Sequence, residues 1–186
     1  MKKLLVLSLV GLAIFISSNV FAFELSFRNG PTFKVKNWID TQYKLGLNFA
    51  SSSKGANSGF MSSTTIDLSV LQGTTILWLT PEFQYDIKLG GIPLYLYPKF
   101  GLDLLFGWYP GNFKAFGFGI KAAFGAKFDL GESIFIWAEP LGLNMVFAQY
   151  SWGGIAIPGV PSIALGGWDT SVAMSYDMMF GIGFRL

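Results

Sequence analysis

Long segments of this chain alternate between apolar residues and small or polar residues with a period of two. In the clearest segment, from Val172 to Leu186, every even position is apolar or aromatic, and the odd positions are mostly small or polar. The segments 93–109 and 114–130 repeat this alternation with the same even phase. Successive side chains of a β-strand point to opposite faces, so the pattern predicts strands that each carry one apolar face.

Weaker alternation elsewhere, together with clusters of turn-forming residues, brings the predicted number of strands to eight. The predicted strands span residues 23–30, 40–50, 64–72, 75–89, 92–109, 113–130, 133–149 and 170–186. Gly90-Gly91 predicts a two-residue hairpin loop, whereas segments 51–63 and 151–169 are predicted to be long loops. The apolar phase changes at Glu139-Pro140, which predicts a β-bulge that turns Glu139 inward.

The charged residues lie on the glycine-rich face of these strands, and the opposite face is almost wholly apolar. A soluble β-sandwich would place its polar face outward, and its strands would usually be shorter, at about 5–6 residues. The chain is 52% hydrophobic and only 13% charged, against about 25% charged residues in ordinary soluble domains. These features predict an all-β fold, an antiparallel up-and-down transmembrane β-barrel of about eight strands with polar side chains inside.

The first residues predict a cleaved signal peptide that exports the protein to a bacterial outer membrane. Lys2 and Lys3 precede a short apolar run, and Val20-Phe21-Ala22 fits a cleavage site after Ala22. An uncleaved membrane anchor is the alternative, but the run is shorter than the ~20 residues that a spanning helix needs. The predicted organisation is therefore a signal peptide over residues 1–22 and an outer-membrane barrel over residues 23–186.

The charge of the mature chain does not favour a nucleic acid as a partner. Cleavage would remove two of the 13 basic residues and leave 11 basic and 11 acidic side chains. A net charge of zero gives no electrostatic reason to expect a nucleic acid as partner.

The predicted last strand resembles the C-terminal strand of outer-membrane barrels, which the barrel-assembly machinery recognises by alternating apolar residues and a terminal aromatic. Here the last residue is Leu186, and the aromatic Phe184 stands two positions earlier. The whole mature chain resembles the small barrels of the OmpA, OmpX and OmpW class in architecture. This resemblance implies outer-membrane lipids and the assembly machinery as partners. Because the last strand runs to the end of the chain, we expect no cell-wall-binding domain after it.

This topology leaves a question about the loops. A C-terminus in the periplasm places segment 51–63 on the periplasmic side, where turns are normally short. Either a hairpin is missed or invented near Gln72-Gly73, or the N-terminal segment holds two strands.

The inward positions predict a polar network in the lumen. If Gly90-Gly91 is a two-residue loop, Glu82 faces Lys99 across the hairpin. Buried charges of both signs must be paired. The residues assigned to this network are Glu82, Asp86, Lys99, Asp103, Lys121, Lys127, Asp177 and Arg185. The inward glycines either make room for large neighbours such as Tyr95 and Tyr97 or leave a cavity.

The chain contains no histidine and no cysteine. Histidine is the usual general base near neutral pH, and thiolates are common nucleophiles and metal ligands. We therefore expect no enzyme activity, no cofactor and no metal site. The favoured function is structural or a surface-exposed interaction with an extracellular partner. The alternative is a narrow channel or a carrier of small or hydrophobic solutes, because segment 152–168 is uncharged and apolar.

Several tryptophans and tyrosines lie near the predicted strand ends, where aromatic belts meet lipid headgroups. Trp108 and Tyr150 are the predicted interface anchors. Trp78 and Trp137 are expected to be either buried or lipid-facing.

Overall fold

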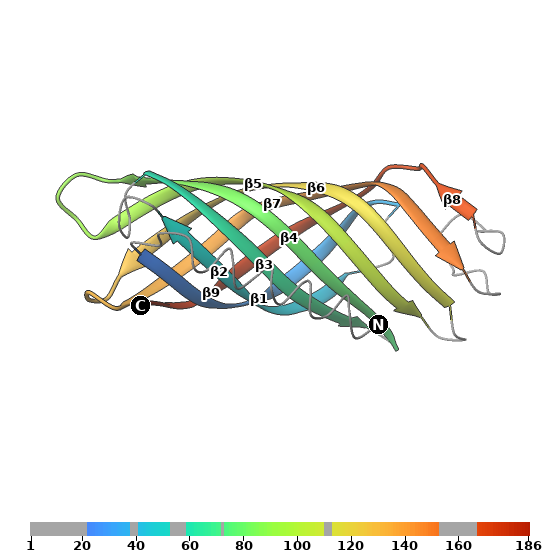
Figure 1. The fold of residues 1–186 in the computed structure, drawn as a ribbon, viewed down its shortest axis with the longest axis horizontal. Helices are drawn as coiled ribbons and strands as arrows, with labels where there is room; N and C mark the ends of the chain where they lie inside the picture. Colours follow the sequence, from blue (N-terminus) through green and yellow to red (C-terminus); the bar gives the residue numbers. More distant parts are fainter. Residues whose placement is uncertain (1–21, 38–40, 53–58, 72, 110–112, 153–166) are drawn as a thin grey trace.

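The computed structural model describes residues 22–37, 41–52, 59–71, 73–109, 113–152 and 167–186. Eight long strands wind around a common axis (Figure 1), and a ninth strand, β8, contains three residues. The strands are β1 (Ala22–Lys36), β2 (Gln42–Ser52), β3 (Gly59–Leu71), β4 (Thr74–Lys88), β5 (Leu94–Tyr109), β6 (Phe113–Asp129), β7 (Ile134–Trp152), β8 (Gly167–Asp169) and β9 (Ala173–Arg185).

The long strands form a closed antiparallel barrel. Consecutive strands pair from β1 to β7, and β9 closes the sheet by pairing with both β7 and β1. The short β8 continues the line of β9 along β7, because Ala173 pairs with Val146 and Asp169 pairs with Gln149. Asp169 accepts a hydrogen bond of 2.8 Å from the Ser171 amide at the break between β8 and β9. The predicted fold class and number of strands are confirmed.

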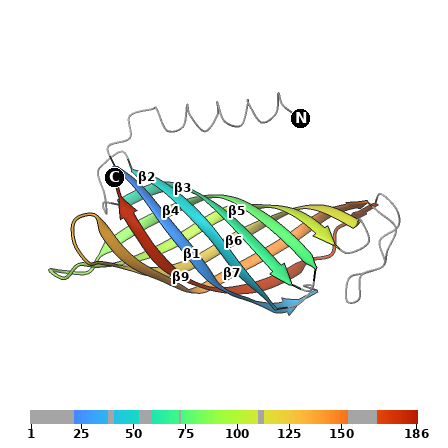
Figure 2. The ribbon, with the colours of Figure 1, turned by 90° about the horizontal axis from the view of Figure 1, so that it is seen from below.

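We call the two ends of the barrel the terminal end, where β1 starts and β9 ends, and the far end (Figure 2). The terminal end holds the start of β1, the end of β9, and the connections 89–93 and 130–133. There the amide of Leu186 donates a 2.9 Å hydrogen bond to the carbonyl of Phe23. The far end holds the end of β1, the start of β9, and β8. No helix in the described part of the chain is long and apolar enough to cross a membrane.

Two boundaries predicted near the N-terminus are wrong. The sequence predicts a first strand that ends at residue 30, but β1 passes through Asn29-Gly30-Pro31 without turning and reaches Lys36. Gly30 is needed there because a Cβ atom would clash with the carbonyl oxygen of Met178 on β9. A glycine-proline pair that usually marks a turn here allows two strands to approach closely.

The predicted long loop 51–63 is also wrong, because most of it is strand. β2 extends to Ser52 and β3 begins at Gly59, so the connection is 53–58, which lies outside the described residues. The hydroxyl groups of Ser51 and Ser62, on paired strands, lie 3.2 Å apart and hydrogen-bond to each other. Serine-rich sequence that is typical of a loop in water thus forms paired strand here. The topology question is answered without a missed or invented hairpin.

The predicted register of the β4–β5 hairpin is wrong by two residues. Glu82 pairs with Gly101, and Gln84 pairs with Lys99. The Leu89 amide donates a 2.9 Å hydrogen bond to the carbonyl of Leu94, so Gly90 and Gly91 are part of a four-residue loop that also includes Ile92 and Pro93. A shift of two residues keeps each side chain on its face, so Glu82 and Lys99 both still point inward.

The other predictions about the faces of the strands are confirmed. The β7–β9 register shifts between Glu139 and Gly142, and Glu139 points inward at 1% exposure. Inward glycines make room for large rings, since a Cβ atom on Gly125 would lie 2.5 Å from Cζ of Tyr97.

Candidate functional site: the barrel interior

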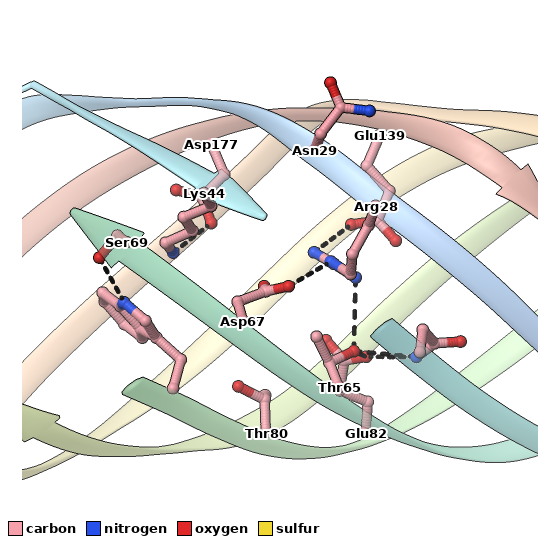
Figure 3. Close-up of polar contacts among 12 residues, drawn as sticks. Arg28, Asn29, Lys44, Thr65, Asp67, Ser69, Thr80, Glu82, Glu139 and Asp177 are labelled. Carbon is pink, nitrogen blue, oxygen red and sulfur yellow. Dashed lines mark hydrogen bonds and ion pairs between the residues drawn. The ribbon is translucent and has the colours of Figure 1, made fainter. Parts of the chain in front are cut away.

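Six charged side chains form a network at the middle of the interior, which we call the central ion network. Its members are Arg28, Asp67, Glu82, Lys99, Lys121 and Glu139. Arg28 Nε lies 2.9 Å from Asp67 Oδ1, and its Nη2 lies 3.5 Å from Glu139 Oε2. Figure 3 shows Arg28 between these two carboxylates. Strands β1, β3 and β7, which are far apart in sequence, are joined through this one guanidinium group.

The two lysines of the central ion network each contact both glutamates. Lys99 Nζ lies 2.6 Å from Glu139 and 3.3 Å from Glu82. Lys121 Nζ lies 2.9 Å from Glu82 and 3.8 Å from Glu139. Three basic and three acidic groups therefore balance one another in a volume without bulk water. Such pairing is what makes buried charge tolerable.

Neutral polar side chains also donate hydrogen bonds to the carboxylate of Glu82. Thr65 Oγ1 donates a 2.6 Å hydrogen bond to Glu82 Oε2, and Asn48 and Ser63 donate to the same oxygen at 3.4 Å. Asn48 Nδ2 also donates to Thr65 Oγ1 at 2.8 Å. The network is thus fixed by hydrogen bonds from β2 and β3 as well as by ion pairs.

Toward the far end the interior becomes partly apolar. Five buried side chains, which we call the far-end apolar layer, pack together near the strand ends: Ile76, Trp78, Leu105, Val146 and Ala173. The indole of Trp78 donates a 3.3 Å hydrogen bond to Ser69 Oγ. The ammonium of Lys44 lies 3.6 Å from the centroid of the Trp78 ring and 2.8 Å from Asp177 Oδ2. One cation therefore joins the apolar layer to the polar interior.

A second ionic group lies at the terminal end, where Lys127 and Arg185 share Glu24. Lys127 Nζ lies 2.9 Å from Glu24 and 2.6 Å from Asp86. Arg185 lies 3.0 Å from Glu24 and 2.5 Å from Asp129. This group ties the first strand to the last strand and to β6, at the point where the barrel closes.

Acidic groups outnumber basic groups in the interior. Among the charged side chains that are buried in the described residues, seven are acidic and five are basic. Six of the seven carboxylates have a basic nitrogen within 4.0 Å. Within the described part of the chain, Asp103 is the exception: Thr80 Oγ1 donates a 2.7 Å hydrogen bond to its Oδ1, and its Oδ2 has no partner.

Little space remains between these side chains. A cavity of about 20 Å³ lies between the terminal-end group and the central ion network, lined by Glu24, Arg28, Tyr97, Lys127 and Glu139 among others. A volume of this size holds about one water molecule. A wider hollow of about 620 Å³ opens at the terminal end beside Tyr95 and Arg185. Within the described residues, the small cavity therefore separates two groups of paired charges.

The structure places all eight residues of the predicted lumen network on the inward face. Glu82, Lys99 and Lys121 come together in the central ion network, and Asp86, Lys127 and Arg185 come together at the terminal end. Asp177 pairs instead with Lys44, and Asp103 joins neither group.

Sequence reasoning left Arg28 and Glu24 out of the network and did not join Glu139 to it. The alternation of Phe23, Leu25 and Phe27 against Glu24, Ser26 and Arg28 was the available signal. This signal was missed because Gly30 and Pro31, which follow it, predict a strand that ends at residue 30.

The aromatic residues divide between the two faces. Trp108 points outward at 44% exposure, and the ring of Tyr150 lies 5.3 Å from that of the exposed Trp168, with the two ring planes tilted by 57°. Trp78 and Trp137 both point inward and are buried.

No protein-family model and no curated protein sequence matches this chain. Solved structures do match its fold. The N-terminal β-barrel domain of OprF from Pseudomonas aeruginosa has a TM-score of 0.55 at 10% identity, covering 89% of this chain and 97% of that domain. A major outer membrane protein from Thermus thermophilus has a TM-score of 0.53 at 11% identity, with coverages of 88% and 99%.

Neisserial surface protein A, NspA, has a TM-score of 0.51 at 10% identity, covering 88% of this chain and 95% of that chain. At these identities the likeness concerns the fold alone. The chain is an eight-stranded antiparallel β-barrel with the fold of these outer-membrane proteins.

Proposed function

We propose that this protein is an integral outer-membrane barrel with a sealed interior, and that its role is structural or a surface-exposed interaction rather than transport or catalysis. The observation that carries this proposal is the filling of the lumen. Two ionic groups and an apolar layer occupy successive levels, and the cavity between the two ionic groups has room for about one water molecule.

The proposal includes an orientation and a route. Residues 1–22 are a signal peptide removed after Ala22, and the terminal end faces the periplasm, as expected for barrels with an even number of strands. The far end then faces outside the cell. The partners are outer-membrane lipids, the barrel-assembly machinery and an extracellular partner.

The test is to refold residues 23–186 into liposomes and to measure leakage of small polar and apolar dyes. Heat-dependent gel migration of the same sample is the control for folding. A sealed interior predicts no leakage above that of protein-free liposomes. Release of the polar dye alone from fully folded samples would overturn the sealed barrel in favour of a narrow channel.

One observation favours that channel as the second candidate. On the polar side of the far end, both amide atoms of Gln42 and the hydroxyl of Thr32 are buried without a hydrogen-bond partner. Buried polar groups of this kind are usually satisfied by water. Release of a polar dye without release of an apolar dye would identify a hydrated path, and release of both would indicate a damaged membrane.

A further inference from the structure

The outward wall of the barrel contains almost no charge. Within the described strands, charged side chains stand at two outward positions, Lys36 and Lys114. Lys36 pairs with the outward Met174, and Lys114 pairs with the outward Trp108. Both are lysines, and both lie at the far end. The outer wall is therefore uncharged over most of its length and basic at one rim.

Lys114 stands at the edge of a continuous group of aromatic rings. Phe116, two residues further along β6, lies 5.0 Å from Phe106 and 4.6 Å from Phe118 between ring centroids. Trp168 continues the group, at 6.5 Å from Phe118 and 5.3 Å from Tyr150. We call these five residues, which extend over strands β5 to β8, the aromatic ladder.

The position of Lys114 relative to these rings sets the level of its ammonium group. Aromatic belts of membrane barrels lie where acyl chains meet headgroups. A lysine stem covers apolar surface while its charged end extends to the polar side. Lys114 forms no ion pair with a carboxylate of the described residues. Its positive charge is thus directed at the headgroup level, and no carboxylate of the described residues pairs with it.

We propose that Lys114 and the aromatic ladder form a binding surface for a phosphate-bearing lipid in the outer leaflet. The ammonium of Lys114 pairs with the headgroup phosphate, and the acyl chains lie along the ladder from Phe106 to Phe118. The proposal rests on the outer-membrane location and orientation given above. A lipid fits better than free phosphate because the apolar wall adjoins the cation and gives a free anion no further contact.

The experiment measures lipid selectivity in bilayers of phosphatidylcholine by electron spin resonance. Spin-labelled phosphatidic acid and spin-labelled phosphatidylcholine are compared for their fractions immobilised at the protein surface. One lysine at an anionic headgroup corresponds to about a fivefold preference. We expect about this preference for phosphatidic acid in the unmodified barrel, and its loss in Lys114→Gln.

Lys34→Gln is the matched control, because Lys34 is also exposed at the far end but pairs with the inward Ser175. The control should keep the preference. Equal preference in Lys114→Gln and the unmodified protein would overturn the proposal. Loss of the preference on adding inorganic phosphate, at constant ionic strength, would assign the site to free anions instead.

The same measurement separates this proposal from the proposed location. If no immobilised lipid is detected for either label, the barrel is not in the bilayer and the proposed function fails. If both labels are immobilised equally, the barrel is embedded and only the lipid site is overturned.

Discussion

Two levels of the same interior are filled in different ways. At the central ion network, charged side chains from β1, β3, β4, β5, β6 and β7 meet across the barrel within 4 Å of one another. At the far-end apolar layer, five buried apolar side chains pack against one another. The central ion network depends on the geometry of its ion pairs, whereas the apolar layer depends on the volume of its side chains. The two levels should therefore respond differently to substitution.

The largest expected effect is at Glu139. Its carboxylate lies within 4.0 Å of nitrogens of Arg28, Lys99 and Lys121. Glu139→Ala leaves buried cations without that counter-charge, and breaking a buried pair in this way costs about 3–5 kcal/mol. Urea unfolding of the refolded barrel in detergent, followed by heat-dependent gel migration, measures the change. Glu132→Ala, in the exposed 130–133 turn, should change the free energy of unfolding by less than about 0.5 kcal/mol.

A similar stability for Glu139→Ala and the unmodified barrel would contradict the importance of the network. Glu139→Gln separates charge from shape, since the amide keeps the size of the side chain. It should recover only a minor part of the loss.

Trp78→Ala tests the apolar layer. The indole is 1% exposed and packs with Ile76 and Leu105. A buried tryptophan replaced by alanine costs about 3 kcal/mol at the low end of the usual range, which we expect because water can enter beside the polar Ser69. The layer is one of the three levels that fill the lumen in our proposal, and release of small polar dyes from liposomes by this variant would identify it as the level that seals the barrel.

The control for that experiment is Trp108→Ala, which removes an outward tryptophan of equal size. It should lower stability by less than Trp78→Ala and leave the liposomes sealed. Sealed liposomes with folded Trp78→Ala protein would show that the two ionic groups close the lumen without the intact apolar layer.

The packing between the central ion network and the ionic group at the terminal end gives a smaller effect. Gly125→Ala would bring a Cβ atom 2.5 Å from Cζ of Tyr97 and 2.7 Å from the carbonyl oxygen of Ala138. Overpacking of this kind costs about 1–3 kcal/mol. Gly131→Ala, at a turn with no atom within 4 Å of the new Cβ, should be neutral. In the double variant Gly125→Ala/Tyr97→Ala, the loss in free energy of unfolding should be smaller than the sum of the two single losses, because the clash with the ring is gone. A loss equal to that sum would contradict this contact.

The two faces of the strands also differ in how far sequence predicts them. The outward face follows from alternation alone, because lipid-facing positions away from the rims of the barrel need an uncharged residue. The inward position of Lys99 follows in the same way. The partners of Lys99 cannot be predicted in this way, because its contact with Glu139 joins β5 to β7. That contact depends on the bulge at Pro140 and on the register of β6.

The boundaries that failed have a common cause. Serines of segment 51–63 and the Gly30-Pro31 pair have the composition of turns in water. In a closed barrel the neighbouring strands supply hydrogen-bond partners, so backbone pairing runs through Gly30-Pro31 and includes residues 51–52 and 59–63 of the serine-rich segment. Local propensity is overridden because unpaired backbone is costly in lipid.

Asp103 should give the smallest effect and one of opposite sign. Within the described residues it has one hydrogen bond, from Thr80, and no basic nitrogen within 4.0 Å. Asp103→Asn keeps the acceptor for Thr80 and removes a buried charge that the neighbouring groups leave without a pair. We expect the free energy of unfolding to stay constant or to rise by up to about 1 kcal/mol.

Asp177→Asn is the matched comparison, because Asp177 has the same size and burial but pairs with Lys44 at 2.8 Å. It should destabilise the barrel in the same urea titration. If both substitutions lower stability equally, the charge of Asp103 is compensated in the folded protein. The surplus of buried carboxylates would then carry no net cost to the stability of the barrel.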